Sequence, residues 1–177
     1  MNQIRFRRPV ATDGAAVYRL IARCPPLDTN SRYCNLLQCT HFADTSIVAE
    51  SDAGVAGFIS GYREPGRDDA LFVWQVAVAP EHRGERLATR MLLQLLRRDD
   101  CRDVRYLTTS ITPDNTASWR TFERLAAALD SHITATAWLS RERHFEGRHD
   151  AEQLVHIGPF TNPIESRPDI TRTEAHA

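Results

Sequence analysis

The stretch from Leu71 to Leu96 constrains the fold more than any other part of the chain. Residues 71–78, LFVWQVAV, are apolar on both faces of an extended strand, which predicts a buried central strand. Pro80 ends this strand, and residues 84–98 then repeat apolar side chains at helical spacing. The residues of that buried stripe are Leu87, Met91, Leu92, Leu95 and Leu96. A central strand that runs directly into an amphipathic helix predicts a sheet layered with helices.

The remaining segments complete an α/β fold with a mixed α+β sheet, in the order β-α-α-β-β-β-α-β-α-β-β. Further strands are predicted at 4–9, 46–51, 54–63, 104–111, 133–139 and 154–158, with tight turns at 52–54 and 66–69. Further helices are predicted from Thr12 or Asp13 to about Cys24, at 31–42 and at 113–129. We therefore expect one domain over residues 1–159. Residues 160–177 are polar and lack periodicity, which predicts a disordered C-terminal tail.

Composition excludes several classes of function. The formal net charge is -1, so no overall basic field attracts nucleic acid. All 22 basic residues are arginine, which excludes lysine nucleophiles and Schiff bases. The four cysteines form no CxxC pair, and the spacing of His144, His149 and Glu152 matches no standard metal site, so we expect no metal. With no signal peptide and no long apolar run, a cytoplasmic protein without a membrane partner is expected.

A local anion site is predicted where the central strand meets its helix, in EHRGERLA (81–88). A helix N-terminus presents unpaired N–H groups and a partial positive charge, so it binds phosphate readily. Gly84 allows a ligand to approach the backbone, and Arg83 and Arg86 add charged donors. A P-loop needs a lysine and a dinucleotide fold needs GxGxxG, so neither fits. The pattern favours a pyrophosphate seat fed by an apolar strand.

This seat resembles the acetyl-CoA motif of the GNAT-type N-acetyltransferase superfamily, [RQ]-x-x-G-x-[GA], which follows a strand and opens a helix. Its positions here are Arg83, Gly84, Glu85, Arg86, Leu87 and Ala88, with Arg86 in place of the expected glycine. The resemblance implies a GNAT fold, a central mostly antiparallel sheet flanked by helices, and acetyl-CoA as co-substrate. It also implies that the strand before the motif is splayed by a bulge and pairs with the pantetheine arm through residues 76–78 (Val76, Ala77 and Val78). Asn115 matches an asparagine that contacts the same arm.

Longer segments are similar to the L-2,4-diaminobutyrate acetyltransferases of ectoine biosynthesis. They are PPLDTNSRY, CTHFADTSIVAE, GFISGYR, LFVWQVAV, TPDNTASW and LVHIGP. This resemblance implies acetylation of the γ-amine of diaminobutyrate and a homodimer. It places Asp28, Trp74, His149 and Glu152 at the substrate site, and Tyr33 would help to shape the pocket.

Each of these residues also has a structural explanation. Asp28 follows two prolines and could serve a turn, Trp74 in a central strand is more often core, and His149 and Glu152 could belong to a solvated loop. Either His149 or Glu152 could accept the proton from the attacking amine, and the sequence does not decide between them. The tyrosine that often protonates the leaving thiolate in this superfamily is replaced by Phe122. Two other functions fit the same motifs, namely acetylation of another small diamine or polyamine and a silent acyl-CoA-binding sensor.

Overall fold

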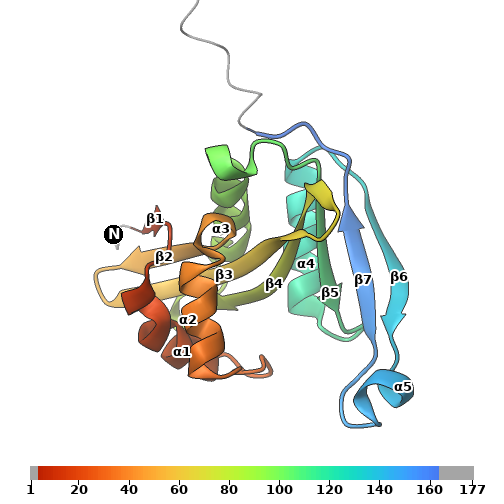
Figure 1. Ribbon diagram of the computed structural model, residues 1–177, viewed down its shortest axis with the longest axis horizontal. Coiled ribbons are helices and arrows are strands. Elements are labelled where there is room, and N and C mark those ends of the chain that lie inside the picture. Colours follow the sequence, from red (N-terminus) through yellow and green to blue (C-terminus); the bar gives the residue numbers. More distant parts are fainter. Residues whose placement is uncertain (1–3, 164–177) are drawn as a thin grey trace, which may run out of the picture.

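The computed structural model describes residues 4–163, which form a single seven-stranded sheet in the order β1-β2-β3-β4-β5-β7-β6 (Figure 1). The strands are β1 (Arg5–Arg7), β2 (Ile47–Ser51), β3 (Gly54–Glu64), β4 (Arg67–Val78), β5 (Tyr106–Ile111), β6 (Ile133–Leu139) and β7 (Glu152–Ile157). The helices are α1 (Gly14–Ala22), α2 (Arg32–Thr40), α3 (Leu87–Leu96), α4 (Thr116–Ala128) and α5 (Arg141–Phe145). Only β4 and β5 pair in parallel, which confirms the mixed, mostly antiparallel sheet.

Helices cover both faces of the sheet. On one face, α3 and α4 bury a large cluster that includes the whole predicted stripe of α3. On the other face, Val17, Leu20 and Ile21 of α1 pack against Val48 and Phe58 of the sheet. The period-3.6 pattern of these helices fixes which side chains face the sheet, so both stripes could be predicted from sequence.

Three local features differ from the predicted elements. The turn after β3 is shorter than 66–69, because Gly66 takes a positive φ of 79° and β4 begins at Arg67. Helix α3 begins at Leu87 rather than at residue 84, because both Gly84 and Arg86 have positive φ angles. The short helix α5 was not predicted. It starts where the side chain of Ser140 accepts a hydrogen bond from the N–H of Arg143 at 3.2 Å.

The folded domain extends beyond the predicted boundary at residue 159. Phe160 is buried in the core on the side of α3 and α4, and its N–H donates to the carbonyl of Arg105 at 3.0 Å. Asn162 is fully buried, and its Nδ2 donates to the carbonyl of Cys101 at 2.8 Å. The predicted start of the tail at residue 160 is therefore too early. The rest of that prediction, residues 164–177, lies outside the described residues.

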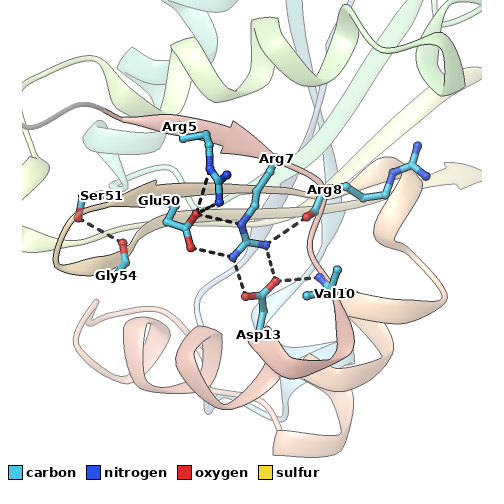
Figure 2. Close-up of polar contacts among 8 residues, drawn as sticks. All are labelled: Arg5, Arg7, Arg8, Val10, Asp13, Glu50, Ser51 and Gly54. Atoms are coloured by element: carbon cyan, nitrogen blue, oxygen red, sulfur yellow. Dashed lines mark hydrogen bonds and ion pairs between the residues drawn. The ribbon is translucent and has the colours of Figure 1, made fainter.

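A charged network fastens β1 to β2 and to the start of α1 (Figure 2). The guanidinium of Arg7 donates to both carboxylate oxygens of Asp13, at 2.7 and 2.8 Å, and also to Glu50. Asp13 accepts in addition from the N–H of Val10 at 2.8 Å. The hydrogen bonds from Arg7 hold the pKa of Asp13 below its ordinary value, against the opposing effect of burial. The network thus joins three segments of the chain at the sheet edge where β1 lies.

Candidate active site

A β-bulge divides strand β4 into two parts. Ser60 of β3 lies opposite Gln75 while Gly61 lies opposite Val73, so Trp74 is the extra residue. The extra residue shifts the alternation of side chains: Val73 packs on the cluster of α3 and α4, and so does Val76, three residues later. Trp74 is 43% exposed, which excludes the alternative that it is a core residue of the central strand. The bulge implied by the family resemblance is present.

On the C-terminal side of the bulge, β4 separates from β5. The parallel register ends at Val73 and Thr109, where the hydroxyl of Thr109 donates to the carbonyl of Val73 at 2.9 Å. In the described residues, 74–78 have no ladder partner on β5. The N–H of Ala79 donates to the carbonyl of Ala56, so by antiparallel alternation the backbone of Ala77 also faces β3. The backbone groups of the residues on either side of Ala77 therefore face the opened side of the strand.

These outward-facing residues are Val76 and Val78. Cys24 donates its thiol to the carbonyl of Val78 at 3.3 Å. The N–H of Val78 and both backbone groups of Val76 remain oriented toward the gap between β4 and β5. An extended ligand with amide groups can pair there as an added strand does. Ala77 lies within the predicted stretch, but its backbone is directed at Phe58.

The exposed turn before α3 continues from this strand. Gly84 has a φ of 86°, and a Cβ placed there would meet no atom within 4 Å, so its backbone is open to a ligand. Arg86 is the N-cap of α3 with φ 55° and ψ 27°, the left-handed conformation that the usual motif glycine adopts easily. Glu85 has its carboxylate 3.4 Å from Nδ1 of His82. Arg83 and Arg86 are exposed, and Leu87 begins the helix as its first buried residue. The turn has the open backbone, helix N-terminus and cations that a pyrophosphate group requires.

Helix α4 begins beside the same gap. Asn115 is its N-cap, and its Oδ1 accepts from the N–H of Ser118 at 3.1 Å. The cap uses the carbonyl oxygen of the side chain, so its NH₂ group is the part that can donate to a ligand. Phe122 is buried in the core with 2% exposure and carries no proton that it could give to a leaving group. Ala88, the last residue of the predicted acetyl-CoA motif, lies within α3 and is partly buried.

The predicted acceptor residues come from three separate segments. Asp28 and Tyr33 lie in the connection from α1 to α2 and at the start of α2, and Tyr33 is 69% exposed. His149 and Glu152 lie in the connection from α5 to β7 and at the start of β7. Both connections lie at the lower edge of the molecule in Figure 1. Trp74 on β4 supplies the third segment.

Within these segments, some side chains already have partners. The carboxylate of Asp28 accepts from the N–H of Asn30 at 3.1 Å, which is the turn role that its sequence context predicted. His149 and Glu152 approach each other, with Nε2 4.0 Å from Oε1, and Nδ1 of His149 lies 2.7 Å from the carbonyl of Asp150. The ring of His149 lies 4.6 Å from that of Phe145. A carboxylate and an imidazole are therefore paired at the start of β7, and each can take a proton.

A wall of aromatic rings was not predicted. Trp138 of β6 lies 6.1 Å from Phe72 of β4, and Phe72 stacks on Tyr62 of β3 at 5.1 Å. The register of β6 also shifts between Ala137 and Leu139, which leaves Trp138 as a bulge residue that is 44% exposed. No spacing in the sequence signals a contact between residues 72 and 138, because the bending of the sheet creates it. Exposed aromatic faces of this kind attract ammonium groups.

Other features lie away from this site or offer no alternative chemistry. A cavity of about 980 Å³ lies at the far ends of α3 and α4, where Arg97, Arg98 and Leu129 line it. Over residues 4–163, no group of three His, Cys, Asp or Glu side chains could hold a metal ion. In the same range, no helix is long and apolar enough to cross a membrane.

Comparison with known proteins gives consistent matches. Residues 15–127 match the acetyltransferase (GNAT) family. The chain is 50% identical to the L-2,4-diaminobutyric acid acetyltransferase of Methylotuvimicrobium alcaliphilum, over 89% of this chain and 91% of the relative. It is 51% identical to that of Vibrio parahaemolyticus, over 86% and 84%. A solved structure of diaminobutyrate acetyltransferase from Paenibacillus lautus, in complex with its substrate L-2,4-diaminobutyric acid and coenzyme A, has a TM-score of 0.86 at 40% identity, covering 90% of this chain and 97% of that one.

Proposed function

The chain belongs to the GNAT acetyltransferase family and, within it, to the L-2,4-diaminobutyric acid acetyltransferases, and we propose that it acetylates the γ-amino group of L-2,4-diaminobutyrate with acetyl-CoA. The product is N4-acetyl-L-2,4-diaminobutyrate, which belongs to ectoine biosynthesis. The observation that carries the proposal is the opened strand β4, which runs from the bulge at Trp74 to the exposed turn before α3. The thioester of acetyl-CoA supplies the activated acetyl group.

The residues of this chain fit acetyl-CoA along its length. The outward backbone groups of Val76 and Val78 would pair with the pantetheine amides, and the NH₂ group of Asn115 would donate to the same arm. The backbone at Gly84 and the guanidinium of Arg83 would bind the pyrophosphate. A backbone N–H beside the thioester carbonyl polarises it, and the fixed approach of the amine supplies much of the acceleration.

The acceptor half binds a zwitterion that carries two amines. We assign the carboxylates of Asp28 and Glu152 to the two ammonium groups, and Trp74 to a cation–π contact with one of them. Tyr33 completes the rim of the pocket. Before attack, the γ-ammonium must lose a proton, and either a neutral His149 or an ionised Glu152, whose side chains lie 4.0 Å apart, can accept it.

We propose that the enzyme is a cytoplasmic homodimer with neither nucleic acid nor membrane as a partner. All four cysteines lie in the described part of the chain as free thiols, as is usual in a reducing compartment. The net charge of -1 favours neither a phosphate backbone nor an anionic surface. Strand β6 forms the outer edge of the sheet and has no charged residue from Ile133 to Leu139. An uncharged exposed edge strand is suited to pairing with a second copy.

The test is thiol release from acetyl-CoA with a panel of diamines, followed by NMR of the acetylated product. We expect diaminobutyrate to be preferred over putrescine, spermidine and ornithine, and acetylation at the γ-nitrogen. The α-amine is the less basic of the two, so free solution chemistry at neutral pH favours the α-product, and only a positioned substrate gives the γ-product. A mainly α-acetylated product contradicts the proposed reaction. Binding of CoA without turnover of any amine supports the acyl-CoA sensor instead.

A further inference from the structure

Gln75 connects the bulge in β4 to the loop that carries Asp28. It follows the extra residue Trp74 directly, and its side chain points to the face of α1 and α2, as that of Ala77 does. Gln75 is 7% exposed. Its Nε2 donates to the backbone carbonyl of Asp28 at 2.7 Å, and its Oε1 accepts from Nδ2 of Asn30 at 3.4 Å. One buried amide therefore contacts the loop at two residues.

These contacts restrain the short turn that carries the carboxylate of Asp28. Asn30 has a φ of 57°, and its N–H donates to the side chain of Asp28. Gln75 holds the backbone of Asp28 on one side and the side chain of Asn30 on the other, so the short turn between them cannot shift without breaking a hydrogen bond. Because Gln75 belongs to β4, the carboxylate is fixed relative to the strand that binds the thioester.

We propose that Gln75 is a positioning residue that sets the distance between the Asp28 carboxylate and the acetyl group, and so selects the length of the diamine. This inference rests on the proposed function, in which Asp28 binds an ammonium group of the acceptor. An additional methylene moves the distal amine by roughly 1 Å relative to a fixed anchor, and a misplacement of that size costs up to about 10²-fold in rate. An anchor that can move accepts either length.

Loss of Gln75 should loosen the loop without unfolding it. The loop keeps a second attachment, because Leu27 packs on the core cluster of α1 and its N–H donates to the carbonyl of Cys24 at 3.0 Å. The sheet offers a matched control at Ser60, the residue directly opposite Gln75 on β3. Ser60 is also buried, and its hydroxyl has no hydrogen-bond partner among the described residues. Ser60→Ala therefore removes a buried polar group beside Gln75 without changing a contact to the loop.

The experiment compares wild type, Gln75→Leu and Ser60→Ala with diaminobutyrate and with ornithine. For Gln75→Leu we expect the KM for diaminobutyrate to rise about tenfold and the preference for diaminobutyrate over ornithine, as a ratio of kcat/KM, to fall by a similar factor. The KM for acetyl-CoA and the affinity for CoA should stay within about twofold, because the cofactor strand is intact. Ser60→Ala should match wild type in all four quantities.

Asn30→Gly provides a second variant if Gln75→Leu does not fold. Glycine keeps the left-handed backbone and removes the donor to Gln75, so the same changes should follow at a smaller amplitude. A folded Gln75→Leu with the wild-type preference for diaminobutyrate overturns the inference, and so does an unchanged preference in Asn30→Gly when that variant alone folds. A wild type that does not acetylate diaminobutyrate rejects the proposed function itself, and this inference with it.

Discussion

We expect Arg86 to have two opposing effects: its left-handed backbone destabilises the fold, and its guanidinium strengthens the binding of CoA. Two substitutions at this position separate these effects. Its backbone is left-handed at the N-cap of α3, and its side chain is exposed at the predicted pyrophosphate seat. Arg86→Gly and Arg86→Ala remove the same guanidinium. The two variants differ only in the backbone: glycine adopts φ 55° freely, whereas alanine retains the steric cost.

The backbone effect can be estimated from this conformation. A non-glycine residue in the left-handed region costs about 1–2 kcal/mol, and glycine loses about 0.5–1 kcal/mol through the greater freedom of its unfolded chain. The net gain of Arg86→Gly is therefore about 0.5–1 kcal/mol, which corresponds to a rise in Tm of about 1–4 °C for a chain of this size. Arg86→Ala should show no such rise.

The side-chain effect should be shared by both variants. An exposed charge pair contributes about 0.2–1 kcal/mol, so CoA should bind up to about fivefold more weakly to either variant. Thermal melts measure the first effect, and calorimetric titration with CoA at low and at 0.5 M salt measures the second. The difference in affinity from wild type should shrink at high salt because exposed charges are screened. An Arg86→Ala variant at least as stable as Arg86→Gly refutes the backbone argument, and unchanged CoA affinity in both refutes the phosphate contact.

Two further predictions concern stability. Arg7 lowers the folded-state pKa of Asp13 below its ordinary value of 3.8, so the ionised carboxylate stabilises the fold above that pH, and this contribution is lost as the pH falls through the folded-state pKa. In urea unfolding, the difference in unfolding free energy between wild type and Asp13→Asn should therefore decrease below about pH 4. Asn162→Ala removes the donor to the carbonyls of Cys101 and Val104, which costs about 1–3 kcal/mol and should lower the Tm by roughly 2–10 °C. Substitution of its exposed neighbour, Thr161→Ala, should change the Tm little. Equal Tm values for the two variants would contradict the burial of Asn162.

The predictable parts of the fold are those with a repeating pattern. The buried stripe of α3 follows from a period of 3.6 and the central position of β4 from an apolar run on both of its faces, and both were confirmed. The burial of Phe160 and Asn162 could not be predicted in this way, because two residues make no period and both fall in a polar stretch. Asn162 in particular donates to the carbonyls of Cys101 and Val104 in the connection between α3 and β5, which is distant from Asn162 in sequence.

The site could be predicted only where a residue belongs to a short local sequence motif. The turn around Gly84 was located from the strand, the glycine and the helix that follows, and its positive φ angle agrees with that reading. Gln75 and Trp138 were not identified, because the importance of each depends on a bulge. A strand that gains one residue reverses the faces of all later side chains, and hydrophobic alternation cannot locate such a change when both faces are apolar.

The bulge at Trp74 also explains how one strand could contact both of the proposed substrates. In an unbroken strand, Gln75 would share the face of Val73 and point into the cluster under α3, where a buried amide finds no backbone carbonyl of the α1–α2 loop. With the extra residue, Gln75 turns to that loop, while Val76 and Val78 pack on the α3 side and direct their backbone groups to the gap beside β5. The same displacement therefore exposes Trp74, which we propose contacts the acceptor, and frees the backbone groups that we propose pair with acetyl-CoA. Restoring a regular strand would move both proposed binding surfaces at once, so the bulge in β4 is what allows the side chain of Gln75 to hold the acceptor loop relative to the strand proposed to bind acetyl-CoA.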